Sequence, residues 1–237
     1  MKNFCLKTEF ANDLSSDPLN QKIFRYLKRA ITECQILPGE QISENEIAGQ
    51  FDFKISRQPV REALIKLSEN KFVEIAPKKG TKVSKISKKD VLQGIEIRCA
   101  LEGIFIKRAV LNFSKNAILD LEENLKLLKQ AIEDNNLKEI FILNNNFHKI
   151  ILKEADMIEA WPVIDKIKNI ANRVCFLAIH FNITENNISY KDHQKILDAI
   201  KTQDPIIAQK VFIEHLQSTK RQLRDIMEIC PQEWFCE

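Results

Sequence analysis

The stretch Ser56 to Leu67, SRQPVREALIKL, predicts a short helix that carries two arginines at its start. Ser56 is a favourable N-cap residue, and Pro59 falls in the first turn, where its missing N–H is not needed. The apolar residues recur at helical spacing and form one buried stripe: Val60, Ala63, Leu64 and Leu67. Arg57 and Arg61 are one turn apart beside this stripe, so both guanidinium groups leave the helix in similar directions.

Two further helices are predicted upstream of this stretch. Apolar residues at helical spacing indicate a helix within residues 18–34, and a Pro-Gly pair at residues 38–39 then breaks the chain. Ser43 is followed three residues later by Glu46, a capping-box pattern that starts a short helix reaching to about Gln50. The helix that begins after Ser56 is therefore the third of three.

Two short β-prone runs follow the third helix. They cover residues 72–75 and 81–84, and the segment Pro77-Lys-Lys-Gly80 between them is typical of a turn with a basic tip. Three helices followed by a two-stranded ribbon make a winged helix-turn-helix. We therefore predict a DNA-binding domain over residues 15–86.

The charge distribution supports a polyanionic partner for this region. Residues 54–89 contain 11 Lys and Arg but only three acidic residues, Glu62, Glu69 and Glu74. Residues 1–89 contain 17 basic and 11 acidic residues. The chain has 36 basic and 33 acidic residues in total, so residues 90–237 contain 19 basic and 22 acidic residues. A clustered basic excess is typical of nucleic-acid-binding domains, although a solvated basic face gives the same count.

Arginine at the start of the third helix suits base recognition. In helix-turn-helix proteins the N-terminal part of this helix enters the major groove, where a guanidinium group can donate to guanine or to phosphate. The alternative is that Arg57 and Arg61 form surface salt bridges with Glu62 or Glu69. The adjoining wing and the basic excess favour the DNA-binding interpretation.

The remainder of the chain, residues 87–230, predicts an all-helical domain. Helices are expected from residue 87 to about 112, and then at about 115–134, 137–154, 157–181, 190–202 and 205–228. Asp204-Pro205 is a cap residue followed by a proline at the first helical position, so this boundary is well defined. The fold class is therefore mainly α, a winged helix-turn-helix followed by a helical bundle.

Three of the four histidines are expected to lie close together in this bundle. Asn144 and His148 are four residues apart and share one helix face. His193 and His215 stand ten and twelve residues from the turn near residue 203, so they are nearly level on adjacent antiparallel helices. These four side chains predict a divalent metal site, whereas the alternative is that each histidine is an ordinary core or surface residue.

The N-terminal motifs resemble those of a known family. The span Leu19 to Ser84, with ILPGEQISENEIAGQF, SRQPVREALIKL and PKKGTKVSKIS, is similar to the DNA-binding domain of the GntR family of bacterial transcription regulators. The resemblance implies DNA contacts at the following residues: Ser56, Arg57, Gln58, Arg61, Lys79 and Gly80. The stretch Phe51 to Ile55 is about two residues longer than the usual turn of the family, which affects the angle between the two helices.

Residues 92–217 resemble the FCD domain, the effector-binding domain of the FadR-like subgroup of that family. Its metal motif is Asp-x-x-x-His on one helix and two later histidines, which corresponds here to Asn144, His148, His193 and His215, with an asparagine in place of the aspartate. The resemblance implies a divalent metal, zinc or nickel. Arg98 matches a position associated with effector binding, and the alternative for this arginine is a structural ion pair with Glu102.

Together these observations predict a ligand-responsive transcription regulator. Its partners are a double-stranded DNA operator, a small carboxylate effector and a second copy of the chain, because helix-turn-helix proteins read paired half-sites. No apolar run is long enough to cross a bilayer and the first residues lack the layout of a secretory signal, so we expect a cytoplasmic protein that does not enter the membrane.

Two other classes of protein remain as alternatives. One is a metal-dependent enzyme that uses the three histidines, and the other is an architectural nucleic-acid binder whose helical domain is purely structural. The sequence contains no H-E-x-x-H motif, nucleophile elbow or phosphate-binding loop, so we predict that the protein is not an enzyme.

Overall fold

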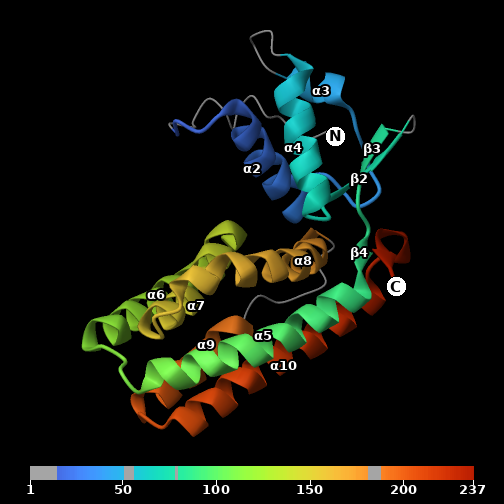
Figure 1. Cartoon of the computed structure of the whole chain (residues 1–237). Helices are drawn as coiled ribbons and strands as arrows, with labels where there is room; N and C mark the ends of the chain where they lie inside the picture. Colours follow the sequence, from blue (N-terminus) through green and yellow to red (C-terminus); the bar gives the residue numbers. More distant parts are fainter. Residues whose placement is uncertain (1–14, 51–55, 78–79, 181–187) are drawn as a thin grey trace. The chain divides into compact units, whose positions relative to one another are not determined.

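The computed structural model describes residues 15–50, 56–77, 80–180 and 188–237, and it is mainly helical, as predicted (Figure 1). The chain divides into two compact units. The first unit comprises Met1–Asp90, Asn169–Asn182 and Ile226–Glu237, and the second comprises Val91–Lys168 and Ile183–Asp225. Three of the four boundaries between the units therefore fall within long helices.

The first unit contains the predicted winged helix-turn-helix. Its helices and strands are α2 (Leu19–Thr32), β1 (Gln41–Ile42), α3 (Glu44–Ala48), α4 (Arg57–Glu69), β2 (Val73–Ala76) and β3 (Gly80–Val83). The strands form an antiparallel sheet in the order β1-β3-β2, in which Thr81 is aligned with Ile42 on one side and Ile75 on the other. The sequence predicted two of these strands but not β1.

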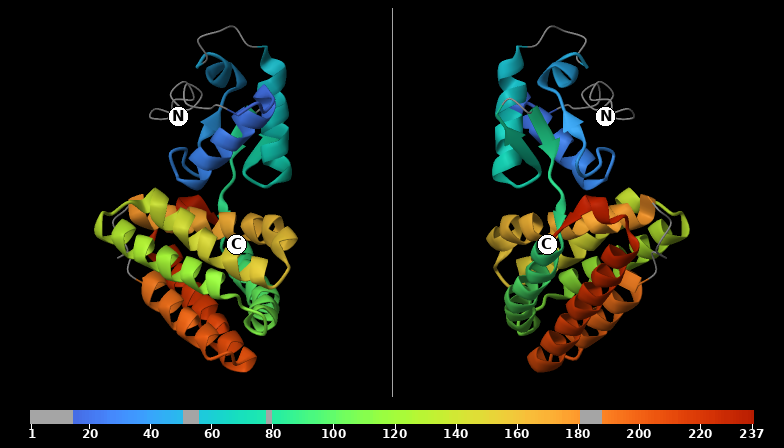
Figure 2. Two further views of the ribbon diagram at one scale, coloured as in Figure 1. Left: turned by 90° about the vertical axis from the view of Figure 1, so that its left-hand side faces the viewer. Right: turned by 90° about the vertical axis from the view of Figure 1, so that its right-hand side faces the viewer.

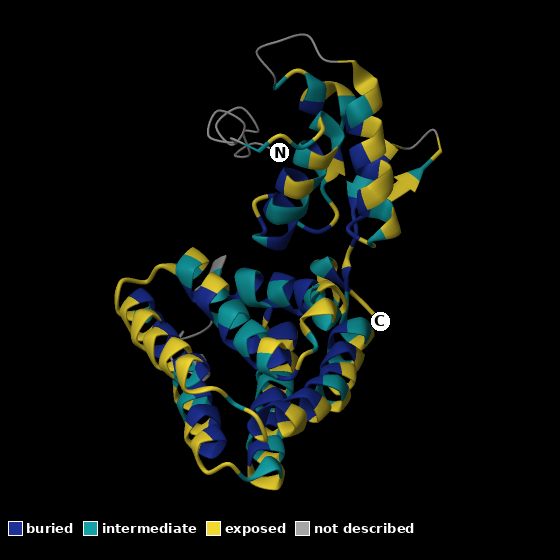
Figure 3. Ribbon diagram, turned by 60° about the vertical axis from the view of Figure 1, so that its left-hand side comes forward, coloured by how far each residue is buried: buried dark blue, intermediate teal, exposed yellow. Residues whose placement is uncertain are grey.

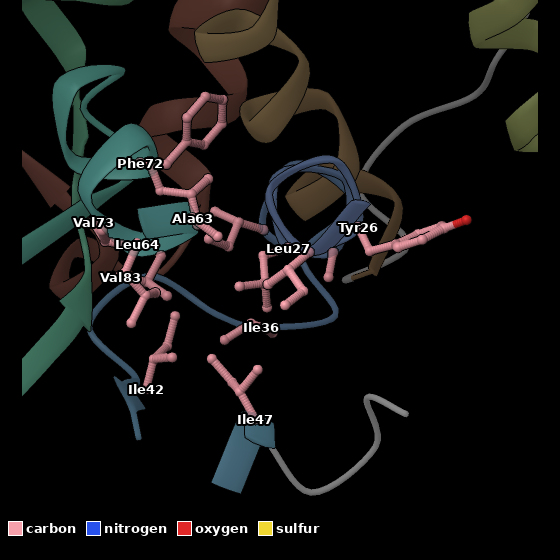
Figure 4. Packing of buried hydrophobic residues seen from close by; sticks show 14 of the residues in the cluster. Tyr26, Leu27, Ile36, Ile42, Ile47, Ala63, Leu64, Phe72, Val73 and Val83 are labelled. Carbon is pink, nitrogen blue, oxygen red and sulfur yellow. The ribbon is translucent and has the colours of Figure 1, made fainter. Parts of the chain in front are cut away.

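One apolar cluster holds these elements together (Figure 4). The predicted stripe of α4 lies in it, and Leu27 of α2, Ile47 of α3 and Val83 of β3 pack into the same core. The side chain of Ser43 accepts a hydrogen bond from the backbone N–H of Glu46, which confirms the predicted cap of α3. The packing orients α4 so that its other face is exposed.

A second, two-stranded sheet in the first unit was not predicted. The strand β4 (Ile86–Ser87) pairs in parallel with β5 (Phe235–Cys236), which follows a single turn of 3-10 helix at Gln232–Trp234. The pairing joins two segments about 150 positions apart in sequence. Local sequence patterns carry no information about such a pair.

The second unit is the core of the helical domain. The helices that contribute to it are α5 (Lys88–Val110), α6 (Lys115–Glu133), α7 (Leu137–Glu154), α8 (Trp161–His180), α9 (Ile188–Lys201) and α10 (Pro205–Ile229), with a 3-10 turn at Ile158–Ala160 before α8. The side chain of Asp204 accepts hydrogen bonds from the N–H groups of Ile206 and Ile207, so α10 begins where the Asp-Pro pair predicts. In both side views, α6 and α7 run next to each other (Figure 2).

Within this unit α5 packs in antiparallel fashion on α10. Lys220 forms a salt bridge with Glu96, and the side chain of Gln209 donates to the carbonyl of Gly103. A Cβ atom at Gly103 would lie 3.2 Å from the side chain of Ile213, so glycine permits the close approach of the two helices. Buried residues line the facing sides of the helices, and exposed residues cover the outer sides (Figure 3).

Within the described ranges, no helix combines the length and the apolar composition that crossing a membrane requires. This finding agrees with the absence of a long apolar run in the sequence.

Candidate functional site

The start of α4 presents two arginines to solvent. Arg57 and Arg61 are both exposed, and within the described residues neither forms a hydrogen bond or a salt bridge. The alternative salt bridge to Glu62 is absent there, because the Glu62 carboxylate accepts hydrogen bonds from Gln58 and Asn20 at 2.8 and 2.7 Å. The two guanidinium groups are therefore available for an external anion.

The other residues that we predicted to contact DNA surround these arginines along the chain. Ser56 occupies the N-cap position of α4 but makes no capping hydrogen bond, so its exposed hydroxyl is not used by the helix. Gly80 begins β3 with a φ of 87°, a conformation that favours glycine at the tip of the wing. Lys79 and the turn Phe51 to Ile55 lie outside the described residues.

The three histidines meet in the second unit. His148 lies on α7, His193 on α9 and His215 on α10, and all three are buried. Their ring centroids are 5.0 to 5.8 Å apart, and one nitrogen of each can be chosen so that all three lie within 4.8 Å of one another. This spacing is suitable for shared coordination of one ion, so the cluster is a candidate metal site.

Aromatic side chains enclose the rings of this cluster. Phe147 stacks on His193 with centroids 4.1 Å apart, and the ring of Phe212 lies edge-on to His148 at 5.4 Å. The three histidines are consequently shielded from water by apolar surface. Neither nitrogen of His193 has a hydrogen-bond partner among the described residues, and neither does Nδ1 of His215.

Glu102 connects Arg98 to the histidine cluster. Its carboxylate is fully buried and lies 2.5 Å from Nε of Arg98 and 2.6 Å from Nδ1 of His148. Since Nδ1 of His148 is engaged by this carboxylate, Nε2 is the nitrogen left for a ligand. The alternative that the sequence left open for Arg98, an ion pair with Glu102, is thus formed.

Burial and neighbouring charges keep the three imidazoles neutral. Burial, followed by the charge of Lys168, lowers the pKa of His148 to about 3. Burial also lowers the pKa of His193 well below its ordinary value, and it lowers the pKa of His215 although the neighbouring Asp192 carboxylate opposes this change. Neutral imidazole is the form that binds metal ions.

Asp192 lies beside His215 on the outer side of the cluster. Its Oδ2 atom is 3.6 Å from Nδ1 of His215, and the interaction with His215 lowers the pKa of the Asp192 carboxyl group. A carboxylate next to a histidine orients the ring and selects its tautomer. Asp192 was not predicted from the sequence, although its position directly before His193 was a signal that could have identified it.

Asn144 makes a contact that the sequence did not predict. Its Oδ1 atom accepts a hydrogen bond of 3.1 Å from Nζ of Lys168, a lysine on α8 that is only 4% exposed. Lys168 was not predicted from the sequence, because nothing in its local pattern distinguishes it from the other lysines of the chain. The structure brings the three histidines together and joins Asn144 to this lysine.

Comparisons with known proteins agree with this organisation. Residues 19–83 match the family described as bacterial regulatory proteins, gntR family, and residues 93–218 match the FCD domain. The HTH-type transcriptional repressor RspR of Escherichia coli (strain K12) is 35% identical over 222 residues, which cover 94% of this chain and 96% of that repressor. The gluconate operon transcriptional repressor of Bacillus subtilis (strain 168) is 25% identical over 231 residues, covering 94% and 90% of the two chains.

A solved structure described as E. coli McbR/YncC has the same fold, with a TM-score of 0.74 at 22% sequence identity over 88% of this chain and 98% of that one. The relatives described above are regulators of transcription, so the prediction that this protein is not an enzyme is confirmed. The winged helix-turn-helix matches the gntR family and the helical domain matches the FCD domain, and the two matched ranges together cover most of the chain. This chain belongs to the GntR family of bacterial DNA-binding transcriptional regulators, in the FadR-like subgroup that carries a C-terminal FCD domain.

Proposed function

We propose that the helical domain senses a small carboxylate effector and that the effector changes the affinity of the winged helix-turn-helix for its operator. The observation that carries this proposal is the buried group of three neutral histidines, in which both ring nitrogens of His193 have no hydrogen-bond partner within the described residues. Polar atoms that are buried without a partner are costly, and a ligand that binds them removes that cost.

A divalent metal fits this donor set. Three imidazoles held close together suit zinc or nickel, and a site with three protein ligands keeps further positions open. We assign the ligands to His148, His193 and His215, since the amide oxygen of Asn144 is engaged with Lys168. When bound, the metal would supply open coordination positions for a carboxylate.

Arg98 is the cation that we assign to the effector in this site. Glu102 lies against its Nε atom, whereas its two terminal nitrogens make no hydrogen bond within the described residues. Guanidinium groups bind carboxylates through such paired donors. Arg98 would therefore hold the effector while Glu102 keeps the side chain in place.

The DNA-binding form that we propose is a homodimer, because paired recognition helices read paired half-sites. An apolar stripe along α5 and just beyond its end supports an interface between copies: Ile97 and Ile104 on α5 and Leu111 directly after it follow one another at intervals of seven and are all exposed. The protein would act in the cytoplasm, where its DNA target lies. The related proteins from E. coli and B. subtilis are named repressors, which supports repression as the outcome of binding.

The segment between the two predicted domains is short, residues 85–89, and we infer that it transmits the effector signal. A ligand that draws helices of the bundle together would then change the spacing of the two recognition helices. Couplings of this kind are about 1 to 3 kcal/mol.

The test is a double variant, His148→Ala with His193→Ala. We expect it to lose bound metal, measured by elemental analysis of the purified protein, and to lose the thermal stabilisation that small carboxylates confer on the wild type. DNA binding should persist, measured on operator fragments selected from the genome of the source organism. Stoichiometric metal and a normal effector response in the double variant would place the sensing site elsewhere.

An architectural role without any ligand predicts a different result. In that case small carboxylates would not stabilise the wild-type protein, and they would not change its affinity for the selected fragments.

A further inference from the structure

Arg173 is a buried arginine that has no acidic partner within the described residues. It lies on the part of α8 that belongs to the first unit, and only 3% of its surface is exposed. One terminal nitrogen donates a hydrogen bond of 2.7 Å to the backbone carbonyl of Ser84, whereas Nε and the other terminal nitrogen donate to no group in the described ranges. By contrast, Arg98, which is buried to a similar extent, is paired with the carboxylate of Glu102.

Among the described residues, no carboxylate acts on the guanidinium group of Arg173. Burial lowers the pKa of Arg173 to about 10, and the groups that oppose this change are the thiols of Cys34 and Cys236. Burial raises the pKa of the Cys34 thiol to about 12, so this thiol is uncharged at neutral pH. A buried charge is costly unless an opposite charge compensates it. An anion from outside the chain would supply that compensation.

Arg173 lines a pocket of about 470 Å³. The other walls come from the end of α4, from β2 and from the segment that joins β3 to α5, so the whole lining belongs to the first unit. This volume lies within the range of sites for small organic ligands. We call this cavity the Arg173 pocket.

The charged side chains of the Arg173 pocket leave an excess of positive charge. Asp90 is paired with Lys71 at 3.4 Å, and Glu74 is paired with Lys82 on β3 at 2.9 Å. Lys85 also lines the pocket; it is exposed and forms no hydrogen bond or salt bridge with the described part of the chain. This lysine and the buried arginine are therefore the cations that remain for a ligand.

The remaining walls of the pocket are uncharged. Ile75, Ile86 and Ile170 provide apolar surface, and Ser68 and Ser84 provide hydroxyl groups. Sites for small organic ligands typically combine apolar walls with a few polar groups that fix the orientation of the ligand. The lining therefore suits an anionic group that is attached to an apolar body.

We propose that the Arg173 pocket binds a small organic anion whose carboxylate or phosphate group accepts hydrogen bonds from the free donors of Arg173. Guanidinium groups bind both kinds of oxyanion through paired donors, and Lys85 adds a second positive charge. This site is separate from the histidine cluster, because all three histidines belong to the second unit. It requires no metal ion.

The position of the pocket on α4 allows DNA and the anion to bind at the same time. Arg57 is the first residue of α4, whereas Ser68, which lines the pocket, is eleven residues further along. At 1.5 Å per residue the two positions are about 16 Å apart along the helix. The anion would instead hold α8 to the segment after β3, where Arg173 already contacts Ser84. We therefore expect the anion to stabilise the protein without competing with DNA.

The experiment measures binding to the full-length protein by isothermal titration calorimetry after metal ions have been removed by chelation and dialysis. The probes are benzoate and phenyl phosphate, with neutral benzamide as the control ligand. The wild type should bind at least one of the two anions and should not bind benzamide. The anion that binds more tightly identifies carboxylate or phosphate as the recognised group.

Two variants test the assigned cations. Arg173→Met should weaken binding of the anion at least about tenfold, as expected for the loss of one hydrogen bond to a charged group. Lys85→Glu changes an exposed side chain, so it does not depend on the packing of the core. It should weaken binding at least about threefold, because repulsion replaces attraction. The matched control is Lys89→Glu, since Lys89 is exposed and lies outside the lining of the pocket, and its affinity should stay within twofold of wild type.

A purely structural role of Arg173 predicts a different result in thermal unfolding. Under our proposal the anion raises the Tm of the wild type, because it binds only the folded state, and it does not raise the Tm of Arg173→Met. If Arg173 serves only to hold Ser84, the anions leave the Tm of the wild type unchanged. That outcome would overturn the inference.

The double variant His148→Ala with His193→Ala separates this inference from the proposed function. It should bind the anion with the affinity of the wild type, because the histidines do not contribute to the Arg173 pocket. If the double variant loses the anion and Arg173→Met keeps it, the ligand occupies the histidine site. In that case this inference is wrong and the proposed function stands. If neither benzoate nor phenyl phosphate binds to the metal-free wild type, the inference is also overturned, whereas a metal-dependent effector site is not affected.

Discussion

Glu102→Gln is the substitution that most directly tests the electrostatics of the histidine site. The carboxylate is fully buried and compensates Arg98, which is only 4% exposed. Glutamine keeps the size of the side chain and can still accept one hydrogen bond from Arg98 or His148. It removes the negative charge, so that the buried guanidinium group loses its counter-ion.

The expected loss of stability follows from this burial. Removing one partner of a buried ion pair typically costs about 3 to 5 kcal/mol, because the remaining charge stays in a medium of low polarity. Burial raises the pKa of Glu102, but Arg98 and His148 lower it by more, so the native carboxyl group is ionised at neutral pH. We therefore expect Glu102→Gln to lower the free energy of unfolding by about 3 kcal/mol.

The measurement is urea unfolding at neutral pH, with stability compared at constant m-value. Glu96→Gln is a matched control on the same helix: Glu96 is paired with Lys220, but its side chain is 65% exposed, so the change should cost less than about 1 kcal/mol. Arg98→Met combined with Glu102→Leu removes both charges and should recover most of the lost stability. The double variant should still lose the effector response.

Two results would refute this reasoning. If Glu102→Gln costs no more than Glu96→Gln, the carboxylate does not compensate a buried charge. If the double variant is as unstable as Glu102→Gln, the loss comes from altered packing and not from an unpaired arginine.

Arg57→Ala and Arg61→Ala should each weaken operator binding by about 1 to 3 kcal/mol in a fluorescence anisotropy titration, and unchanged affinity in both would exclude base contacts by α4. Lys79→Ala should weaken binding to operator and unrelated DNA alike and reduce the slope of log K against log salt by about 1, whereas an unaltered slope would remove this lysine from the DNA. Acid should destabilise the metal-free protein, because burial keeps His148 and His193 neutral in the fold while the unfolded chain takes up protons below the ordinary pKa of 6.5. This stabilising contribution is complete above pH 6.5, and below that pH it declines by about 1.4 kcal/mol per pH unit for each histidine. Stability is measured by urea unfolding, and equal free energies of unfolding at pH 6.5 and about pH 5.5 would contradict the buried neutral state.

The sequence by itself determined the helices and the class of the protein. The stripe of α4, the cap at Ser43 and the start of α10 at Pro205 are all found where the local patterns predict them. These signals involve residues at most four positions apart, so they do not depend on the remainder of the fold. The near-level positions of His193 and His215 also follow from simple helix geometry on either side of one turn.

Only the tertiary structure decided which polar groups meet. Glu102 and His148 are 46 positions apart, Lys168 and Asn144 are 24 apart, and β4 pairs with a strand at the other end of the chain. Each of these contacts depends on how two elements are rotated and shifted against each other, and that is set by the packing of many apolar side chains at once. For this reason the sequence could place Asn144 near the histidines, whereas only the fold shows that a buried lysine takes its side-chain oxygen.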